Sequence, residues 1–267
     1  NLYFKKAITW SALASGAFGA RLSPEGFTFS AKGACAFPST NYFELALGLL
    51  NSVVSGKVFE FFAATLDFNV GSIRKVPLLP DSAYNSGGIS RSVDELIAIA
   101  RADWDNFETS WDFRDQPLLR PGLKGATLEA SWRNWEAQST AAIRRMQELE
   151  TENNRLFIAA YGLDGELQPE VPEEQITLAR ADQKKDVAAF LSYAVGCMMG
   201  RYSLDKPGLI LANPGDTLRE FLAKVGRSHD TLSFTLDEDG IIPVLDGEWF
   251  KDDIVARAHA FLRATFG

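Results

Sequence analysis

The sequence predicts an α+β protein in which a small mixed β/α domain is followed by a mainly helical region with a long spacer helix and a small terminal α/β unit. Residues 1–38 contain short aromatic segments between glycine, serine and proline residues, which is typical of short strands. Most of the remaining chain carries apolar residues at helical spacing. A polar stretch over residues 81–92, with Gly87-Gly88 inside it, predicts a linker, so we place the domains at 1–88 and 89–267.

The N-terminal domain continues after its strands with a change of period. Apolar residues from Tyr42 to Phe62 recur every three or four positions, which predicts a helix, and Ser55-Gly56 predicts a break or bend in it. The alternation over Leu66–Gly71 predicts one more strand that turns at its end. Two prolines close the segment Ile73–Pro80, which we expect to be an extended return.

Helical patterns organise the next part of the chain. A short helix is predicted over Val93–Trp104, and an irregular segment over Asp103–Pro121 follows it. The longest pattern runs from Thr127 to Tyr161, and Gly162 is placed to end that helix. At about 1.5 Å per residue such a helix would span on the order of 50 Å, which is typical of a spacer.

A second amphipathic helix and a small α/β unit complete the predicted fold. Asp182 is placed to cap this helix. Its apolar stripe consists of Val187, Phe190, Leu191, Ala194, Val195 and Met198. The terminal unit is predicted as strand, helix, strand and helix over Leu209–Leu211, Asp216–Val225, Ile241–Val244 and Asp252–Leu262. We expect Trp104 and Trp111 to be packing residues that join the linker to the helices.

Composition and charge narrow the class of protein. Hydrophobic residues make up 46% and charged residues 23%, which are ordinary globular values, and no apolar run is long enough to cross a membrane. The net charge is −8, yet residues 1–80 hold seven Lys/Arg and four Asp/Glu and are +3, which leaves −11 for the remainder. An acidic protein with a basic N-terminal part can bind a phosphate backbone through one face. Cys35 and Cys197 are expected to be reduced thiols of a cytoplasmic protein.

Several chemistries have no motif in these 267 residues. The sequence contains neither a Walker-type phosphate loop nor a Gly-x-Ser-x-Gly elbow, and its two histidines lack metal-ligand spacing. Asn213-Pro214-Gly215-Asp216 lacks the second proline and the aromatic ring that a DNA amino-methyltransferase places beside a flipped base. We interpret Asp237–Asp239 and Asp252-Asp253 as solvated turns or helix-start charges in preference to Mg²⁺ ligands. We therefore expect no catalytic residue, metal site or cofactor in this chain, whose apolar ends suggest a piece of a longer polypeptide.

Three stretches of sequence resemble one family of enzymes. The first combines Tyr3-Phe4 and Ile8-Thr9-Trp10-Ser11 with Arg21 and Gly26-Phe27. The second combines Leu47–Ser52 with Thr65–Ile73 and Val76-Pro77. The third is Trp104–Phe113, and Gly200–Gly208 and Asp237–Val244 give further support. They resemble the region downstream of the catalytic domain in the adenine-specific DNA methyltransferases of BREX phage defence, the PglX family. The second stretch is also similar to specificity domains of type I and type IIG restriction systems, whereas the Trp-Asp-Asn-Phe-Glu-Thr-Ser-Trp-Asp-Phe string is narrower.

The resemblance implies that the intact enzyme transfers a methyl group from S-adenosylmethionine to adenine N6 in a short DNA site, which marks host DNA against phage restriction. This chain would supply target recognition, with residues 1–88 as the recognition domain. Its implied partners are double-stranded DNA, other BREX subunits and acidic phage inhibitors that mimic DNA, and no membrane. Two alternatives remain open: a scaffold module that docks other defence subunits, or the specificity region of a type I or IIG enzyme.

Sequence readout needs cations on phosphates and bidentate side chains on base edges. The phosphate candidates are Lys5, Lys6, Lys32, Lys57 and Lys75. Arg21 and Arg74 are candidates for guanine, Asn41 and Asn69 for adenine, and Ser72 lies where backbone N–H groups could meet a phosphate.

Overall fold

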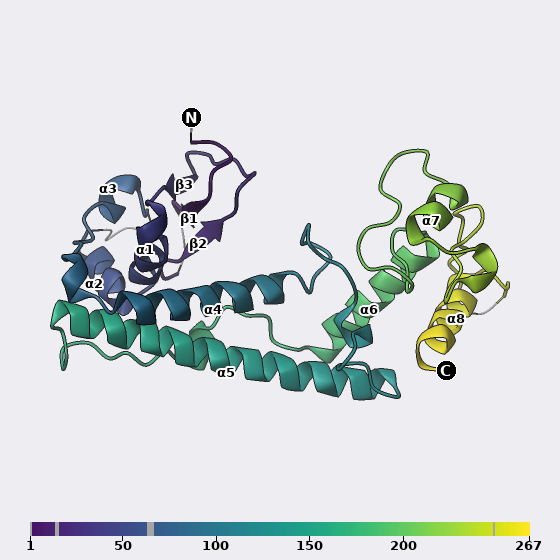
Figure 1. Ribbon diagram of the computed structural model, residues 1–267. Helices are drawn as coiled ribbons and strands as arrows, with labels where there is room; N and C mark the ends of the chain where they lie inside the picture. The colour runs from purple at the N-terminus through teal and green to yellow at the C-terminus, as the bar shows by residue number, and fades with distance from the viewer. Residues whose placement is uncertain (1, 14–15, 63–66, 248) are drawn as a thin grey trace. The chain divides into compact units, whose positions relative to one another are not determined.

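The computed structural model describes residues 2–13, 16–62, 67–247 and 249–267, and Figure 1 shows its helices and strands. A small antiparallel sheet combined with many helices confirms the α+β class. The chain forms two compact units, of which unit 1 is Asn1–Ala100 with Ala142–Thr177 and unit 2 is Arg101–Ala141 with Leu178–Gly267. The predicted division at residue 88 stays a prediction, and each unit is described by itself.

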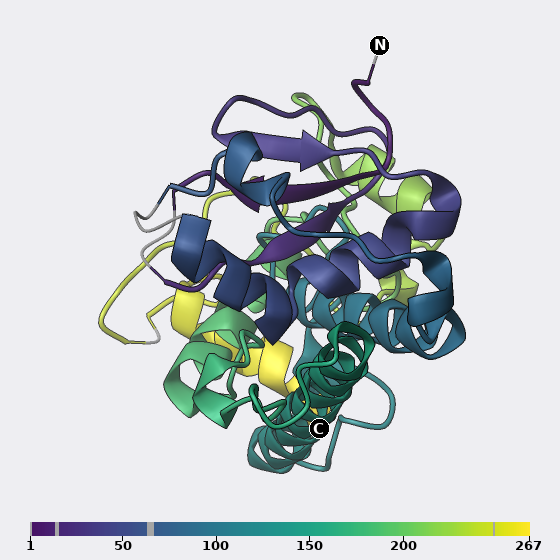
Figure 2. The same cartoon turned by 90° about the vertical axis from the view of Figure 1, so that its left-hand side faces the viewer.

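The sheet of unit 1 has three short strands, as predicted for residues 1–38. They are β1 (Ala7–Ser11), β2 (Ala20–Ser23) and β3 (Gly33–Ala36). The central strand β1 pairs antiparallel with both neighbours, in the order β2-β1-β3. Figure 2 shows the three strands lying side by side, with the next two helices of the chain along one side of the sheet.

The helical segment after the sheet bends, but not at the predicted position. A short 3-10 turn, η1 (Thr40–Tyr42), leads into α1 (Phe43–Leu50), and α2 (Val53–Phe62) follows at an angle of 69°. The break therefore lies at Asn51-Ser52, and the predicted break at Ser55-Gly56 is wrong. The Ser55 hydroxyl donates to the Leu49 carbonyl at 2.6 Å, so this serine stabilises the bend from inside α2.

No single helix among the described residues is long and apolar enough to cross a membrane. The bent pair formed by Thr40–Leu50 and Val53–Phe62 meets that test of length and composition only when its two parts are counted together. Six of the eight residues of α1 are buried in the protein core, which accounts for the apolar composition.

The strand predicted over Leu66–Gly71 is wrong for the residues that the structure describes, which are Asp67–Gly71. Leu66 lies outside the described residues. Asp67 forms only an isolated bridge with Leu13, and the chain then enters the short helix α3 (Val70–Ile73). The Asn69 side chain accepts from the Ser72 backbone N–H at 3.1 Å and caps this helix. The local cap therefore outweighs the alternating pattern. The segment from Arg74 to Pro80 has no regular structure and ends at η2 (Asp81–Ala83).

The linker predicted over 81–92 is wrong because α4 (Ser86–Trp104) begins inside it. The Asn85 side chain accepts from the Gly88 backbone N–H at 3.2 Å, which places both glycines in the first turn. Ile89 and Val93 are 0% and 2% exposed, so this turn belongs to the core. Burial of an apolar helix face outweighs the low helix propensity of the two glycines.

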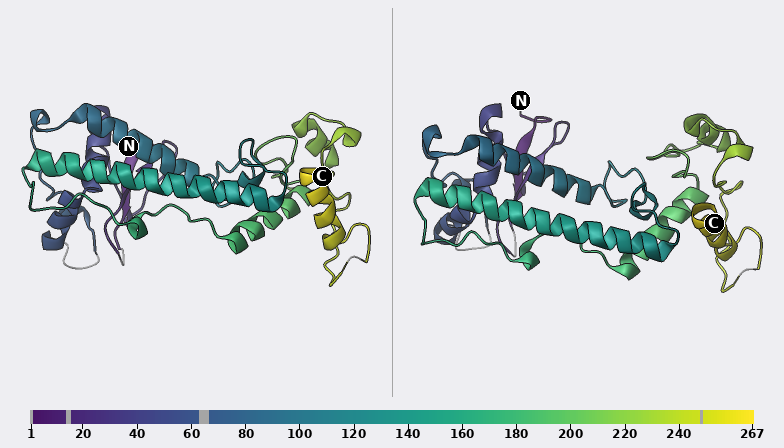
Figure 3. Two further views of the ribbon diagram at one scale, coloured as in Figure 1. Left: turned by 90° about the horizontal axis from the view of Figure 1, so that it is seen from below. Right: turned by 60° about the horizontal axis from the view of Figure 1, so that its bottom comes forward.

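The long helix α5 (Leu128–Tyr161) confirms the prediction over Thr127–Tyr161, and Gly162 with φ of 64° ends it. Figure 3 shows α4 beside α5 in both views. Within unit 1, Arg145 of α5 donates to both carboxylate oxygens of Glu95 on α4, at 2.7 and 2.8 Å. Asn153 and Asn154 of α5 are buried and form hydrogen bonds with the backbone of α1 and α2 on either side of the bend. The unit closes through η4 (Glu173–Gln175).

Unit 2 contains η3 (Pro117–Leu119), α6 (Gln183–Met198), α7 (Leu218–Val225), η5 (His229–Thr231) and α8 (Ile254–Phe266). Its core is aromatic, and Phe190 and Phe261 pack edge to face with ring centroids 5.5 Å apart. Asp182 caps α6 as predicted, because its side chain accepts from the backbone N–H groups of Lys184 and Lys185. The helices predicted over Asp216–Val225 and Asp252–Leu262 exist, although each begins two residues later than predicted.

Two strands predicted for unit 2 are wrong. In the segment Leu209–Leu211, only Ile210 and Leu211 donate backbone hydrogen bonds, to Arg201 and Gly200, and no strand forms. In Ile241–Val244 the end residues are 68% and 80% exposed, and the segment is a loop. A short apolar run is a weak strand signal. Neither segment has a neighbouring strand to pair with among the described residues.

The two thiols lie in different environments and should react differently. Burial raises the pKa of the Cys197 thiol to about 12, whereas Cys35 is partly exposed on β3. We expect a thiol reagent to modify Cys35 in the native protein at pH 8 and Cys197 only after unfolding. Mass spectrometry of the labelled peptides checks this, and equal labelling of both thiols in the native state would contradict it.

Stability should fall with rising pH because of Glu150 on α5. Burial raises the pKa of its carboxyl to about 7, above the ordinary 4.5. The fold thus favours the neutral acid, and its ionisation costs stability progressively from about pH 4.5 to above pH 7. Glu150→Gln should raise Tm by a few degrees at pH 8 and leave it nearly unchanged at pH 4. Glu136→Gln, on the exposed side of α5, is the control, and a Glu150→Gln shift independent of pH would reject this account.

Candidate nucleic-acid interface

The two faces of the sheet differ in chemistry because side chains alternate along each strand. Register places Ile8 between Leu22 and Ala36, and Trp10 between Ala20 and Ala34, and these residues belong to the core of unit 1. The opposite side is here called the outer sheet face. Its strand residues are Ala7, Thr9, Ser11, Arg21, Ser23, Gly33 and Cys35. All but Arg21 are small, and Ala7, at 2% exposure, is buried.

Arg21 lies on the edge strand β2, at one end of a row of residues that crosses the outer sheet face. It stands opposite Thr9 on β1, and Thr9 stands opposite Cys35 on β3, so the three residues form one row across the sheet. The exposed Arg21 guanidinium donates to the Ser11 hydroxyl at 2.9 Å. The Thr9 hydroxyl donates to the Ala34 carbonyl at 3.1 Å. A guanidinium is therefore held on an otherwise small, polar surface.

A second group of predicted residues gathers around the short helix α3. Asn69 caps this helix, and Ser72 is 5% exposed with its hydroxyl 3.4 Å from the Phe62 carbonyl. The Lys75 ammonium lies 4.5 Å from the centroid of the Phe62 ring, which is 50% exposed. Arg74, the next cation, is exposed. The Asn69 side-chain oxygen and the Ser72 hydroxyl thus bond within the fold, whereas both cations are exposed.

The remaining predicted residues lie apart along unit 1. Lys6 is 3.5 Å from a Glu44 carboxylate oxygen and 3.9 Å from the centroid of the Phe43 ring. Lys57 pairs with Glu60 of the same helix at 2.9 Å. Such surface ion pairs contribute only about 0–1 kcal/mol each, so both lysines can exchange partners. The other three predicted residues, Lys5, Lys32 and Asn41, are exposed.

The outer sheet face contains residues that the sequence interpretation did not select. Thr9, Ser11 and Cys35 share the face of Arg21 by register, although charge counting passes over small neutral residues. The alternation of Ile8 and Trp10 with Thr9 and Ser11 was a signal that could have identified the solvent side of β1. The pairing partners on β2 and β3 depend on register, which sequence spacing alone does not determine.

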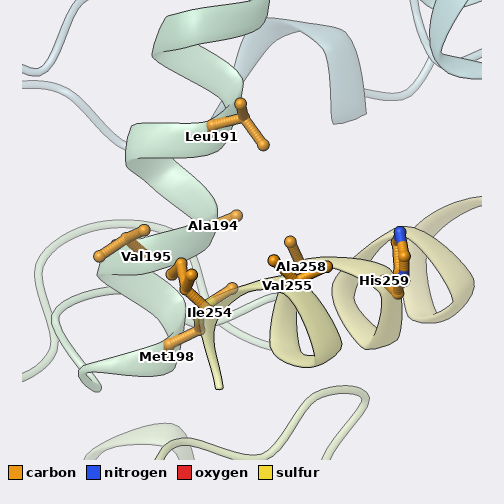
Figure 4. Close-up of a pocket in the computed structure, with 8 residues that line it drawn as sticks. All are labelled: Leu191, Ala194, Val195, Met198, Ile254, Val255, Ala258 and His259. Atoms are coloured by element: carbon orange, nitrogen blue, oxygen red, sulfur yellow. The ribbon is translucent and has the colours of Figure 1, made fainter. Parts of the chain in front are cut away.

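Unit 2 presents an apolar groove between α6 and α8, with a volume of about 260 Å³. Figure 4 shows the side chains that line it, which are Leu191, Ala194, Val195, Met198, Ile254, Val255, Ala258 and His259. Leu191 and Val195 are 45% and 39% exposed. The predicted stripe on α6 is therefore only partly buried, because its outer edge lines this groove.

Two tryptophans that were predicted to pack are exposed, so that prediction is wrong. Trp104 is 59% exposed and Trp111 is 98% exposed. The loop that carries Trp111 is nevertheless well bonded: the Ser110 hydroxyl donates to Asp105 at 2.6 Å, and Arg101 pairs with Asp112 at 3.2 Å. Polar contacts hold this loop, and its large aromatic side chain points into solvent.

The acidic clusters serve the backbone, in agreement with their interpretation as turns and helix starts. Asp237 accepts from the backbone N–H groups of Gly240 and Ile241. Asp253 caps α8 by accepting from Ala256 at 2.8 Å, and these backbone bonds lower its pKa. Within the described residues, no group of three or more His, Cys, Asp and Glu side chains is arranged to hold a metal ion.

Comparison with known proteins identifies two relatives along the whole chain, although no protein-family model matches it. The chain is 35% identical over 270 residues to the adenine-specific methyltransferase PglX of Lacticaseibacillus casei (strain Zhang), which covers 99% of this chain and 21% of that protein. It is 30% identical over 291 residues to the adenine-specific methyltransferase BrxX of Escherichia coli O9:H4 (strain HS), which covers 100% of this chain and 23% of that protein. The chain thus spans about a fifth of the length of the curated relatives it matches. The resemblance expected from the sequence is confirmed: over its whole length, the chain is homologous to one region of the PglX and BrxX adenine-specific methyltransferases.

Proposed function

We propose that this chain is the part of an adenine-specific DNA methyltransferase that binds the DNA target, and that residues 1–88 contact the duplex. The observation that carries the proposal is the similarity to two adenine-specific methyltransferases along the entire chain. Enzymes of this chemistry act at chosen sites, so they need a surface that reads base edges as well as a catalytic centre.

The charge distribution of the chain supports this assignment. Residues 1–80 are +3 in a protein of net charge −8, and their exposed cations include Lys5, Arg21, Lys32 and Arg74. Cations on phosphates provide affinity and orientation, and a side chain with several donors provides sequence selectivity. The N-terminal part thus carries both kinds of side chain. The rest of the chain has a net charge of −11, which would repel a polyanion such as DNA.

The intact enzyme would act in BREX phage defence in the cytoplasm, where it would methylate adenine N6. S-adenosylmethionine and the transfer step would belong to the rest of that enzyme, because the motifs for both are not found in these 267 residues. Acidic inhibitors that mimic DNA would compete for the same cations. Type I and IIG specificity regions are the alternative within this function.

Duplex binding with a steep salt dependence is the expected outcome for the full 267-residue chain. With about four phosphate contacts, affinity should fall roughly 100-fold between about 50 and 200 mM salt, since counterions are released on binding. Fluorescence anisotropy with a labelled duplex measures this. Replacing Lys5 and Lys32 with alanine should make the salt slope shallower by about two units. The control is alanine at the exposed Lys184 and Lys251, which lie outside residues 1–88. Failure to bind any duplex at about 50 mM salt would defeat the proposal.

A docking function for unit 2 is a second candidate, and the groove between α6 and α8 favours it. Its walls are apolar and open, and Trp249 and Phe250 in the loop before α8 are 75% and 57% exposed. Apolar surface of this kind is typical of protein contacts. The partner would be another defence subunit or a further region of the methyltransferase.

A charged group in the groove should abolish such docking. Val195→Asp places a carboxylate among apolar side chains, and we expect at least a tenfold loss of affinity for the docked subunit. Ser192→Asp adds the same charge to an exposed position of α6 that does not line the groove. Calorimetric titration with purified BREX subunits compares the two variants, and equal affinities would exclude the groove as the docking surface.

A further inference from the structure

We propose that the outer sheet face reads one base pair of the target and that Arg21 is its discriminating residue. This inference rests on the proposed function of DNA binding by residues 1–88. It goes beyond that function because it selects one surface and one side chain from the ten candidates that the sequence suggested.

The shape of the outer sheet face allows a base edge to approach it. The strand residues around Arg21 are alanine, glycine, serine, threonine and cysteine, all of which are short. The Arg21 side chain is longer than these and exposed, and its guanidinium lies along the face within 2.9 Å of the Ser11 hydroxyl. A base edge that approaches this end of the row can therefore contact the guanidinium.

Contacts of the Arg21 side chain and of the neighbouring β2 backbone fix the position of this arginine. On the outer sheet face the exposed guanidinium donates to Ser11 through Nη2, which uses one of its five N–H donors. In the backbone, the preceding residue Ala20 exchanges two hydrogen bonds with the Asn51 side chain, at 2.8 and 3.0 Å. A donor held in this way loses little conformational entropy when it binds, and its geometry suits guanine O6 and N7.

The contacts of Arg21 differ from those of three lysines of the same unit. Lys6 and Lys57 each lie against a glutamate, and Lys75 lies over the Phe62 ring. The partner described for Arg21 is a neutral hydroxyl, and no carboxylate occurs among the strand residues of its face. The face is thus complementary to the electronegative edge of guanine, and this complementarity favours DNA over an apolar protein partner as the occupant.

Selection from random duplexes tests the role of Arg21. We expect the full chain to select a motif that includes a guanine, and Arg21→Lys to lose preference at that one position by about fivefold or more. Lysine keeps the charge but cannot make the planar bidentate contact, so overall affinity at low salt should change little. Arg91→Ala is the control, because Arg91 is an exposed arginine of α4 outside the sheet and its loss should leave the motif unchanged.

The outcomes separate the two proposals. If the unaltered chain shows no sequence-dependent binding, the proposed function and this inference both fail. If it selects a motif and Arg21→Lys keeps every preference, only the inference fails. A loss of preference at one position in Arg21→Lys, together with an unaltered Arg91→Ala motif, supports it.

Cys35 gives an independent readout because it lies in the same row as Arg21. We expect a saturating selected duplex to slow alkylation of Cys35 at least fivefold, while an unrelated duplex at the same concentration protects it less. Equal alkylation rates with and without the selected duplex would overturn the placement of DNA on this face. Protection by a BREX subunit and not by DNA would also overturn it and would assign the face to protein.

Discussion

Three asparagine side chains connect the sheet, the helix bend and the long helix of unit 1, and the geometry of the outer sheet face depends on them. Asn51 bonds to the backbone N–H and carbonyl of Ala20 on β2. From α5, Asn153 donates to the Gly48 carbonyl at 3.0 Å, and Asn154 accepts from the Val53 N–H at 2.9 Å. A buried amide contributes modestly when it is bonded but costs about 1–3 kcal/mol when one partner is lost. These contacts therefore specify one angle between α1 and α2.

The same contacts explain how an acidic protein can present a cationic surface. The sheet is covered on its apolar side, where the Trp10 indole N–H donates to the Phe68 carbonyl at 2.8 Å. With that side closed, alternation places Thr9, Ser11 and Arg21 on the other side. The position of the cation thus follows from packing of the apolar residues and not from attraction between charges.

Sequence patterns predicted the elements whose signals are local. The long helix to Tyr161, the cap at Asp182 and the short strands before residue 38 were correct because periodicity and capping residues act within a few positions. The linker over 81–92 was wrong because burial of Ile89 outweighed two glycines. Predicted site residues could be selected by charge but not by face, since the neighbours of Arg21 lie on another strand, β1, and sequence spacing does not determine the strand register that pairs them.

Gly48 shows how closely α5 and α1 approach. A Cβ atom built on this glycine would lie 2.8 Å from the Asn153 side-chain oxygen and 3.0 Å from a Val93 methyl carbon. Replacing a glycine within a helix by alanine normally stabilises the helix by nearly 1 kcal/mol. Here the added methyl group would push against the asparagine that spans the two helices. Engineering for thermostability by helix propensity alone would include this position and would weaken the joint that supports the sheet.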